Sequence, residues 1–412
     1  MNKNQTKFLY VGVDLHKEKH VAVIIDCWNE KLGEIAIENR PTAFPKLTQA
    51  VKKHLKRGQS PIYGLEDVGG FGRSLAIYLK EQQAVVKEVN PKRSSDKRKA
   101  NITMEKYDSW DAECVARVLR DDWKVLPDVN PLDHYWAIGQ LVKVRAGLAS
   151  HYIGNVRRLH QQLSYHYPSY KQFFSQVDGK TALAFWENYP SPRCLAKVTE
   201  LELAVFLKRE SNHYLSLNKA KQIMKCILED GATERECQNQ RDVIVQTLVR
   251  SHRSTRREMN ILEEELGKLL LEIGCTLDSM PGIDKVTASS FVAEIGEIER
   301  FEHADKLARF AGIAPVMYGS GNKRQYHKSK QGNRILHDLF KQLAIRQLVV
   351  AKKTKQARNA YLLHYYEQKI KEGKSKRQAI VCLMRKLVNV VYYLMKSRAK
   401  YQMPYLPEQH VG

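Results

Sequence analysis

Short apolar runs separated by polar turns dominate the first 125 or so residues. The segments FLYVGVD (residues 8–14) and VAVIID (21–26) are rich in β-forming residues, with a polar LHKEKH stretch between them, and GEIAIE (33–38) alternates apolar and polar positions. Runs of this kind predict three adjacent strands joined as hairpins.

Helical and strand-like segments alternate after these strands. Apolar residues with helical spacing are Phe44, Leu47, Val51 and Leu55. A strand at 62–66, a helix near 71–79, a strand at 84–89 and a helix at about 108–119 follow. The resulting order, β-β-β-α-β-α-β-α, predicts an α/β domain over residues 1–125.

The pattern is almost wholly helical between residues 130 and about 274. Apolar residues recur there among charged ones: Ile244, Leu248, Leu262, Leu266, Leu269 and Ile273. We expect long helices and a coiled-coil arm from this pattern. Residues 165–192 are aromatic and punctuated by proline, which predicts an irregular turn between helices. Residues 126–275 are therefore interpreted as a helical and coiled-coil connector.

The last third, residues 276–412, is predicted to form a mainly α-helical C-terminal domain. We expect a short helical hairpin at 279–296, a glycine-containing basic loop at 318–333, and helices from there to about residue 400.

Basic residues are in excess and unevenly distributed. The 412 residues include 68 Lys+Arg against 45 Asp+Glu, a formal net charge of +23, and residues 321–412 alone hold 21 Lys+Arg against 4 Asp+Glu. A solvated helical face usually mixes signs, so this asymmetry indicates a surface for a polyanion such as nucleic acid. A second basic cluster precedes the helix at residue 108: Lys87, Lys92, Arg93, Lys97, Arg98 and Lys99.

Three further patterns narrow the class of protein. The most apolar C-terminal stretch, 381–395, is interrupted by Arg385 and Lys386, so no membrane span is expected. The seven cysteines are scattered and form no C-x-x-C pair, which indicates neither a disulfide framework nor a zinc site. The first residues lack the pattern of a secretory signal, so we expect a cytoplasmic protein.

Four carboxylates follow predicted strand ends or open a predicted helix. Asp14 ends the first strand, Glu66 ends the fourth, and Asp108 and Asp111 begin the last helix of the α/β domain, three residues apart and so on one face. Divalent cations such as Mg²⁺ prefer oxygen ligands, and paired ions stabilise both oxygens in phosphoryl transfer. Each carboxylate also has an ordinary explanation as a turn or capping residue. Their combination with this strand order favours a metal site.

The segments VGVDLHK, YGLEDVGG and KYDSWDAECVARVL, in that order and spacing, resemble the DEDD domain of a bacterial insertion-sequence transposase family that includes the pilin-inverting recombinases. The resemblance implies an α/β ribonuclease-H-like fold, similar to Holliday-junction resolvases. It also implies that Asp14, Glu66, Asp108 and Asp111 bind Mg²⁺.

The segment beginning SMPGIDKV resembles a helix-hairpin-helix, whose turn offers backbone N–H groups to a DNA phosphate without reading sequence. Gly282 is the expected contact. Asp284 stands where many such turns have a second glycine, and its carboxylate would repel phosphate, so a purely packing role for this turn stays open.

A second block, YGSGNKR followed by SKQGNR, is similar to the same family's S-G and S-K-x-G-N elements. The resemblance implies that Ser320 is the nucleophile that becomes joined to a DNA phosphate. Taken alone, Gly-Ser-Gly is typical of a flexible turn, and serine needs a base or metal to activate it; His327 is close in sequence but not adjacent. His337 departs from the family pattern. The side chains that suit phosphate or ribose contacts are Lys323, Arg324, Ser329, Lys330, Asn333 and Arg334.

The resemblance spans nearly the whole chain and implies a homodimer or tetramer in which the acidic site of one protomer completes the serine site of another. Some relatives use an element-encoded bridge RNA to pair with donor and target DNA, and they act in the bacterial cytoplasm at the nucleoid. Two other functions stay open. A metal-only junction endonuclease would use water in place of Ser320, and a non-catalytic nucleic-acid-binding protein would need no cleavage at all.

Overall fold

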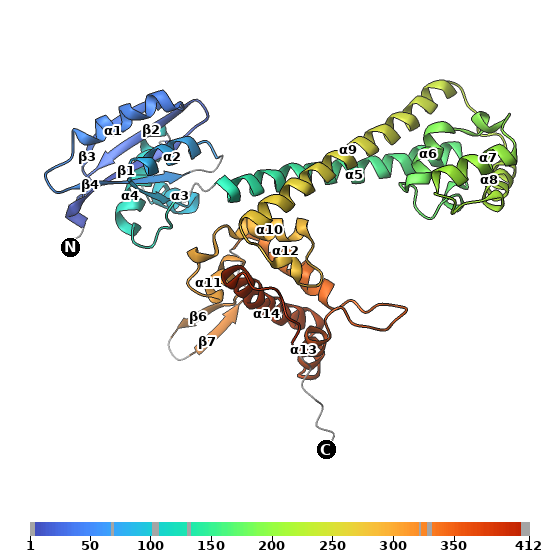
Figure 1. Ribbon diagram of the computed structural model, residues 1–412. Helices are drawn as coiled ribbons and strands as arrows, with labels where there is room; N and C mark the ends of the chain where they lie inside the picture. The colour runs from blue at the N-terminus through green and yellow to red at the C-terminus, as the bar shows by residue number, and fades with distance from the viewer. Residues whose placement is uncertain are drawn as a thin grey trace, which may run out of the picture. The chain divides into compact units, whose positions relative to one another are not determined.

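The computed structural model describes residues 5–66, 70–100, 107–129, 133–320, 323–327 and 332–404. The chain divides into two compact units, Met1–Asp133 and His134–Gly412. Each unit is described separately below (Figure 1).

The first unit is a mixed α/β domain. Its strands are β1 (Phe8–Leu15), β2 (Lys19–Ile25), β3 (Lys31–Glu38), β4 (Ser60–Glu66) and β5 (Val85–Glu88). Its helices are η1 (Gln5–Lys7), η2 (Pro41–Ala43), α1 (Phe44–Lys52), α2 (Arg73–Glu81), α3 (Pro91–Lys99) and α4 (Asp108–Asp122). The predicted order of strands and helices is confirmed, with α3 as one helix more than the prediction contained.

The five strands form one sheet in the order β3-β2-β1-β4-β5. β1, β2 and β3 are antiparallel neighbours, as the hairpin pattern predicts, whereas β4 pairs parallel to β1 and β5 parallel to β4. The helices α1 and α2 supply the crossovers that parallel strands require. β1 is therefore the central strand, and its end lies beside the end of β4.

Both faces of the sheet are covered by helices. Leu9, Val11 and Val13 of β1 belong to the core shared with α1 and α2, while Tyr10 faces the opposite core, which α4 covers. Gly12 also faces α4, so closely that a Cβ atom there would lie 2.2 Å from the backbone oxygen of Ala112. Only glycine permits this contact, which brings the start of α4 over the end of β1.

α3 lies along α4 and carries the basic cluster noted in the sequence except for Lys87, which lies in β5. Asn90 caps its N-terminus by accepting a hydrogen bond from the backbone N–H of Lys92. Ion pairs then join it to the C-terminal end of α4: Arg93 to Asp122 at 2.6 Å and Lys97 to Asp121 at 2.6 Å. α3 has almost no apolar stripe, so hydrophobic periodicity could not reveal it.

The second unit is mostly helical. Its helices are α5 (Asp133–His166), η3 (Tyr170–Gln172), α6 (Lys180–Asn188), η4 (Pro192–Leu195), α7 (Glu200–Glu210), α8 (Leu217–Asp230), α9 (Gln238–Glu272), η5 (Leu277–Ser279), α10 (Lys285–Ile295), η6 (Ile298–Arg300), α11 (Ala304–Phe310), α12 (Arg334–Gln347), α13 (Ala360–Lys371) and α14 (Lys376–Ser397). Its strands are β6 (Val316–Ser320) and β7 (Lys323–His327).

The long helices α5 and α9 run antiparallel side by side (Figure 1). Arg145 donates to Glu263 at 2.8 Å, and ten residues further along α5 Asn155 donates to Ser251 at 3.0 Å. At the far end of this pair, α6, α7 and α8 enclose an aromatic core that contains Tyr167, Phe173 and Trp186. The stretch 165–192, predicted as an irregular turn, contributes the aromatic residues of this core, and the helix α6 lies within this stretch.

The remaining helices share one core, to which the C-terminal end of α9 contributes Leu266 and Leu270. Two expectations differ from the structure here. The range 279–296 holds one α-helix, α10, and a single 3-10 turn, η5, stands before its loop. Residues 318–320 and 323–327 of the segment expected as a basic loop lie instead in the antiparallel strands β6 and β7, which pair through their backbones.

α14 is long and apolar enough to cross a bilayer by length and composition alone, although the sequence pattern predicts no span. Its apolar face, which includes Leu383, Leu387 and Val391, is fully buried in the core. Tyr392 on the same helix donates to the backbone oxygen of Phe301 at 2.9 Å. These contacts are those of a core helix.

Candidate metal centre and serine hairpin

The register of the sheet places Asp14 directly opposite Glu66. They are Cα partners in the parallel pairing of β1 with β4. Successive residues of a strand point to opposite faces, so Asp14 lies on the face of Tyr10 and Gly12, and Glu66 on the face of Ile62, which is the α4 face in both strands. Two carboxylates from different parts of the sequence therefore meet under α4.

Asp108 and Asp111 bring the other two predicted carboxylates from the first turn of α4. Asp111 is buried and forms an ion pair of 2.7 Å with Arg98 of α3. Asp108 is more exposed and forms an ion pair of 3.1 Å with Lys19 at the start of β2. The four carboxylates thus gather at one corner of the sheet, and two basic side chains balance part of their charge.

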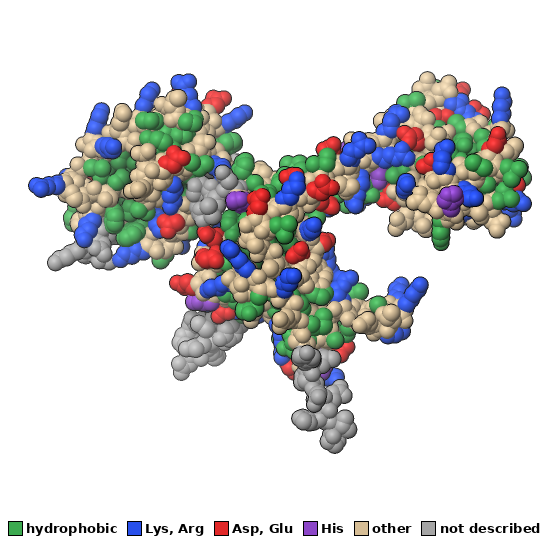
Figure 2. Space-filling view, viewed as in Figure 1, with side chains coloured by type: hydrophobic (Ala, Val, Ile, Leu, Met, Phe, Trp, Pro, Cys, Tyr) green, Lys and Arg blue, Asp and Glu red, His purple; other side chains and the backbone are tan. Residues whose placement is uncertain are grey.

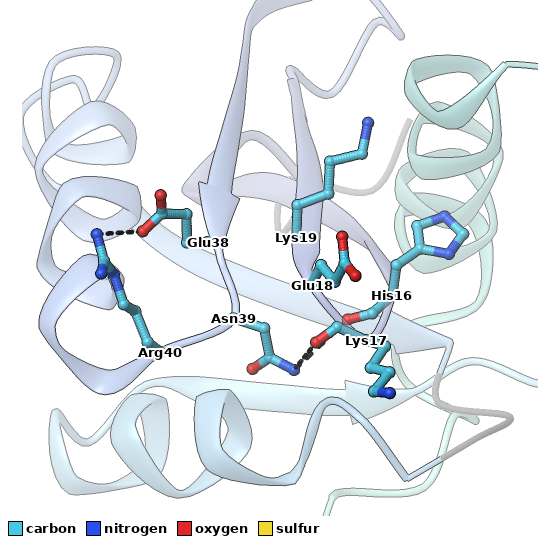
Figure 3. Close-up of a pocket in the computed structure, with 7 residues that line it drawn as sticks. All are labelled: His16, Lys17, Glu18, Lys19, Glu38, Asn39 and Arg40. Atoms are coloured by element: carbon cyan, nitrogen blue, oxygen red, sulfur yellow. Dashed lines mark hydrogen bonds and ion pairs between the residues drawn. The ribbon is translucent and has the colours of Figure 1, made fainter.

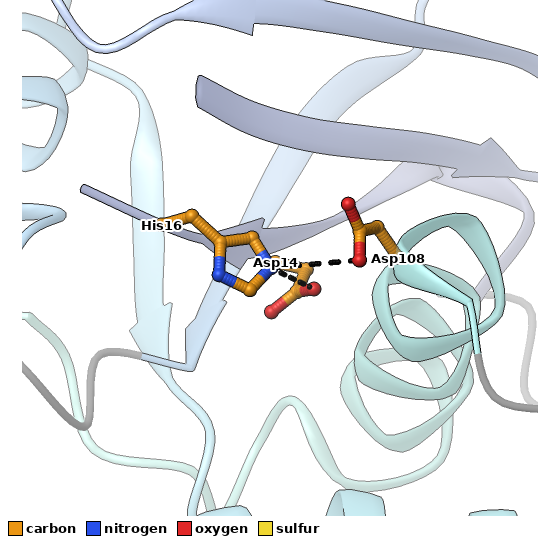
Figure 4. A group of neighbouring side chains, drawn as sticks. All are labelled: Asp14, His16 and Asp108. Atoms are coloured by element: carbon orange, nitrogen blue, oxygen red, sulfur yellow. Dashed lines mark hydrogen bonds and ion pairs between the residues drawn. The ribbon is translucent and has the colours of Figure 1, made fainter. Parts of the chain in front are cut away.

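His16 lies between two of these carboxylates (Figure 4). Its Nε2 atom is 3.0 Å from Asp14 Oδ2 and 3.7 Å from Asp108 Oδ1. One ligand atom from each of the three side chains lies within 4.8 Å of the others, a spacing that would allow all three to hold one metal ion.

An open hollow adjoins this group and shares His16 and Lys19 with it (Figure 3). Asn39 anchors the hollow: its side-chain amide donates to the backbone oxygen of Lys17 at 3.2 Å and to that of Phe71 at 3.1 Å. The turn that carries His16 is thereby attached to the segment that precedes α2.

The pKa values of the carboxylates reflect their burial and the charges and hydrogen bonds around them. Burial raises the pKa of Asp14, and the negative charges of Asp111 and Asp108 raise it further against the lowering effect of His16. Burial also raises the pKa of Glu66, with contributions from Asp14 and Asp111, although a hydrogen bond from Ser94 and the charge of Arg98 lower it. The hydrogen bond from Lys19 lowers the pKa of Asp108.

This donor set suits a hard divalent cation. Carboxylate oxygens are the ligands that Mg²⁺ prefers, and mutual repulsion of like charges is relieved when a cation binds between them. Burial is the largest cause of the raised pKa values of Asp14 and Glu66, and the neighbouring carboxylates add to it against the lowering effects of His16 and Arg98. Asp14 and Asp108, with His16, are therefore placed to hold a metal ion, and the binding of Mg²⁺ by all four carboxylates stays a prediction.

Sequence reasoning misses His16 and Arg98. His16 stands two residues after Asp14, in a turn interpreted only as polar. The sequence pattern groups Arg98 with the basic cluster as a polyanion contact, whereas its guanidinium forms an ion pair with Asp111. The tertiary packing of α3 on α4 is what brings this cation to the site.

Ser320 is the last residue of β6 and pairs across the hairpin with Lys323, the first residue of β7. His327 pairs instead with Val316, at the other end of the hairpin. Four residue steps separate Lys323 from His327, about 13 Å along the strand, so His327 is not positioned to activate Ser320.

Only the backbone of this hairpin is described, so the predicted contacts of Lys323 and Arg324 stay predictions. Ser329 and Lys330 lie outside the described residues.

Asn333 and Arg334 begin α12. The Asn333 side chain caps the helix by accepting from the backbone N–H of Leu336 at 2.9 Å, and its amide group donates to Glu294 at 2.6 Å. Arg334 is exposed. Asn333 therefore has a structural role in this conformation. The exposed side chain of Arg334 is accessible to solvent, as the predicted contact with a phosphate requires.

The turn at Gly282 is held by the protein's own side chains. Gln347 donates to the backbone oxygen of Pro281 at 2.7 Å, and Arg346 donates to that of Gly282 at 3.2 Å. Asp284 caps α10 by accepting from the backbone N–H of Thr287 at 2.7 Å. These contacts give Asp284 a packing role in the turn, and the predicted phosphate contact of Gly282 stays a prediction.

Comparison with known proteins defines the class. A family described as "Transposase" matches residues 11–168, which include all four carboxylates. A second family, described as "Transposase IS116/IS110/IS902 family", matches residues 275–362, which include Ser320. Both matches are to transposase families. Over residues 11–168 and 275–362 the chain is therefore similar to insertion-sequence transposases.

Individual relatives show the same similarity. The insertion element IS116 uncharacterized 44.8 kDa protein of Streptomyces clavuligerus is 26% identical over 405 residues, 95% of each chain. The transposase for insertion sequence element IS1111A of Coxiella burnetii is 29% identical over 127 residues, 31% of this chain and 34% of the relative. The pilin gene-inverting protein of Moraxella bovis is 30% identical over 122 residues, 29% of this chain and 36% of the relative.

Proposed function

We propose that this protein cuts and rejoins DNA at the ends of an insertion element, with Asp14, Glu66, Asp108 and Asp111 as Mg²⁺ ligands and Ser320 as the nucleophile. The observation that carries the proposal is the convergence of four carboxylates from β1, β4 and α4 at one corner of the sheet, in a chain similar to insertion-sequence transposases. The strand order and the mixed parallel and antiparallel pairing support a ribonuclease-H-like fold for this domain.

The chemistry is a phosphoryl transfer in two steps. The Ser320 hydroxyl oxygen attacks phosphorus, the phosphorus–oxygen bond to one DNA strand breaks, and that strand leaves with a hydroxyl group. A strand-end hydroxyl then attacks the phosphoserine and restores a phosphodiester, so no external energy source is needed. When bound, Mg²⁺ supplies charge stabilisation at the phosphate oxygens.

Residues of this chain supply the proton transfer. Carboxylate oxygens of the acidic corner that are not held by Mg²⁺ would accept the hydroxyl proton as the serine oxygen attacks, and would return a proton to the oxygen of the leaving strand. This step requires that the acidic corner and Ser320 meet at one DNA strand. We propose that they meet within a homodimer or tetramer, in which the acidic site of one protomer completes the serine site of another.

The helical arm of α5 and α9 is proposed as a coiled-coil connector for this assembly, and η5 with α10 as a helix-hairpin-helix that contacts DNA. The excess of positive charge is compatible with a structured bridge RNA as a second nucleic-acid partner. The proposed site of action is the bacterial cytoplasm, at the nucleoid.

Covalent trapping tests the nucleophile. Labelled DNA carrying the element junction is incubated with the full chain and Mg²⁺, and protein–DNA adducts that survive denaturation are counted. The wild type should form the adduct, Ser320→Ala should form none, and the matched control Ser150→Ala, an exposed serine of α5, should behave as the wild type.

The outcomes separate the alternatives. Cleavage by Ser320→Ala without attached protein, abolished by Asp14→Asn, would identify a metal-only endonuclease. DNA binding without cleavage by the wild type under any metal condition would identify a non-catalytic binding protein.

A further inference from the structure

An exposed basic segment connects α12 to α13 and is used neither by the metal centre nor by the serine hairpin. Residues 349–358 (VVAKKTKQAR), here called the basic finger, hold Lys352, Lys353, Lys355 and Arg358 and contain no carboxylate. The finger projects from the helices at its base, and Lys and Arg side chains gather at its free end (Figures 1 and 2).

The finger is ordered by its own backbone. Val350 and Ala357 form an antiparallel bridge, and Arg358 donates its backbone N–H to Val349 at 2.9 Å. The tip is closed by a hydrogen bond of 2.9 Å from the N–H of Lys355 to the oxygen of Ala351. A preformed tip presents its cations without the entropic cost of ordering a loose loop.

The base of the finger is clamped on both sides by buried side chains. Gln347, at the end of α12, donates to Pro281 at 2.7 Å, and Asn359, before α13, donates to the Tyr401 hydroxyl at 2.9 Å. Both side chains are fully buried. The direction in which the finger points is therefore determined by the core.

The charges at the tip lack the partners that basic residues have elsewhere in this chain. Lys97 pairs with Asp121 and Arg145 with Glu263, but among the ion pairs of the described residues none includes Lys352, Lys353 or Lys355. All three are exposed. Like charges gathered without counter-charges repel one another, and binding to a polyanion relieves that repulsion.

We propose that the basic finger binds the phosphate backbone of duplex DNA, with Lys352, Lys353 and Lys355 as the contacting cations. The Thr354 hydroxyl lies among them and adds a neutral donor of the kind that reaches phosphate oxygens. The three lysines carry their charge as ammonium groups, which attract phosphate oxygens whatever the base, so we infer a contact independent of sequence. The choice of DNA as partner rests on the proposed function.

The test is binding of the full chain, in EDTA, to a short labelled duplex of arbitrary sequence, measured across a range of salt concentrations. The variant Lys352→Gln/Lys353→Gln/Lys355→Gln should bind about tenfold more weakly, and its slope of log K against log salt should be shallower by up to about 2.7, since each lost phosphate contact removes about 0.9. Replacing all three lysines by arginine should preserve binding.

The matched control removes the same charge from exposed lysines of α7 and α8: Lys208→Gln/Lys221→Gln/Lys225→Gln. Its affinity should fall much less than that of the finger variant. Equal losses in the two variants, an unchanged slope in the finger variant, or a loss confined to RNA of the same length would each overturn the inference. EDTA prevents metal-dependent cleavage, so failure here would leave the proposed reaction untouched, and Asp14→Asn should retain finger-dependent binding.

Discussion

The guanidinium of Arg98 lies 2.7 Å from the buried carboxylate of Asp111, and so an arginine from α3 supplies a positive charge inside a cluster of four carboxylates. The side chain of Arg98 is 26% exposed and that of Asp111 12%. The same guanidinium lowers the pKa of Glu66. In the metal-free protein, Arg98 therefore balances part of the negative charge of the acidic corner.

Replacing Arg98 by glutamine should destabilise the metal-free protein by about 2 kcal/mol. Breaking a fully buried ion pair costs about 3–5 kcal/mol, and partial exposure of Arg98 reduces that figure. Chemical denaturation in EDTA measures the effect, and titration with Mg²⁺ should restore more stability to the variant than to the wild type.

Lys97→Gln is the matched control, because it removes an ion pair of α3 that is more exposed and remote from Glu66. It should cost about 0–1 kcal/mol. A variant of Arg98 as stable as this control, with no greater gain from Mg²⁺, would show that Arg98 does not balance the acidic cluster.

Neutralising a crowded carboxylate should stabilise the metal-free protein at neutral pH. The pKa values of Asp14 and Glu66 lie above their usual 3.8 and 4.5, so the folded protein binds these protons more tightly than the unfolded chain does. The stability due to protonation is full below about pH 4 and is lost as the pH rises through the raised values.

Asp14→Asn and Glu66→Gln each replace an ionisable carboxyl by a neutral amide, so these variants do not lose that stability as the pH rises. Each should raise Tm by about 2 °C at pH 7 in EDTA, with the difference from the wild type closing near pH 4, while DNA cleavage disappears. Glu81→Gln, at an exposed carboxyl of α2, should change neither property. A lower Tm for both site variants at pH 7 would contradict the repulsion described here.

Gly12 should tolerate no side chain. In Gly12→Ala the new Cβ would lie 2.2 Å from both Ala112 O and Ala116 N, so α4 must move away from β1. We expect a loss of about 3 kcal/mol in the free energy of unfolding and reduced Mg²⁺ binding, because α4 carries two of the proposed ligands.

Gly147 of α5 offers the opposite case, since no atom lies within 4 Å of an added Cβ there. Gly147→Ala should stabilise the helix by about 0.5–1 kcal/mol. Denaturation curves of both variants measure these changes in the free energy of unfolding. A Gly12→Ala protein with wild-type stability would mean that the close approach of α4 to β1 is not required.

Much of the acidic site was predictable because local patterns encode it. Strand alternation places Asp14 and Glu66 at strand ends, and the i, i+3 spacing places Asp108 and Asp111 on one helical face. Local patterns did not predict the β6–β7 hairpin or α3. The hairpin is held by backbone pairing and α3 by ion pairs, and neither shows hydrophobic periodicity. Local patterns also gave no sign that Asn333 caps α12 while its amide group binds Glu294.

The sequence was thus enough to predict the mixed α/β class, the helical remainder, the similarity to transposases and the proximity of the four carboxylates. Folding in three dimensions alone decided that Arg98 and His16 would join those carboxylates, and that Gln347 and Asn359 would clamp the basic finger. The reason is physical: periodicity reports which residues avoid water, whereas the partner of a charge or a hydrogen-bonding group is chosen by packing between segments distant in sequence.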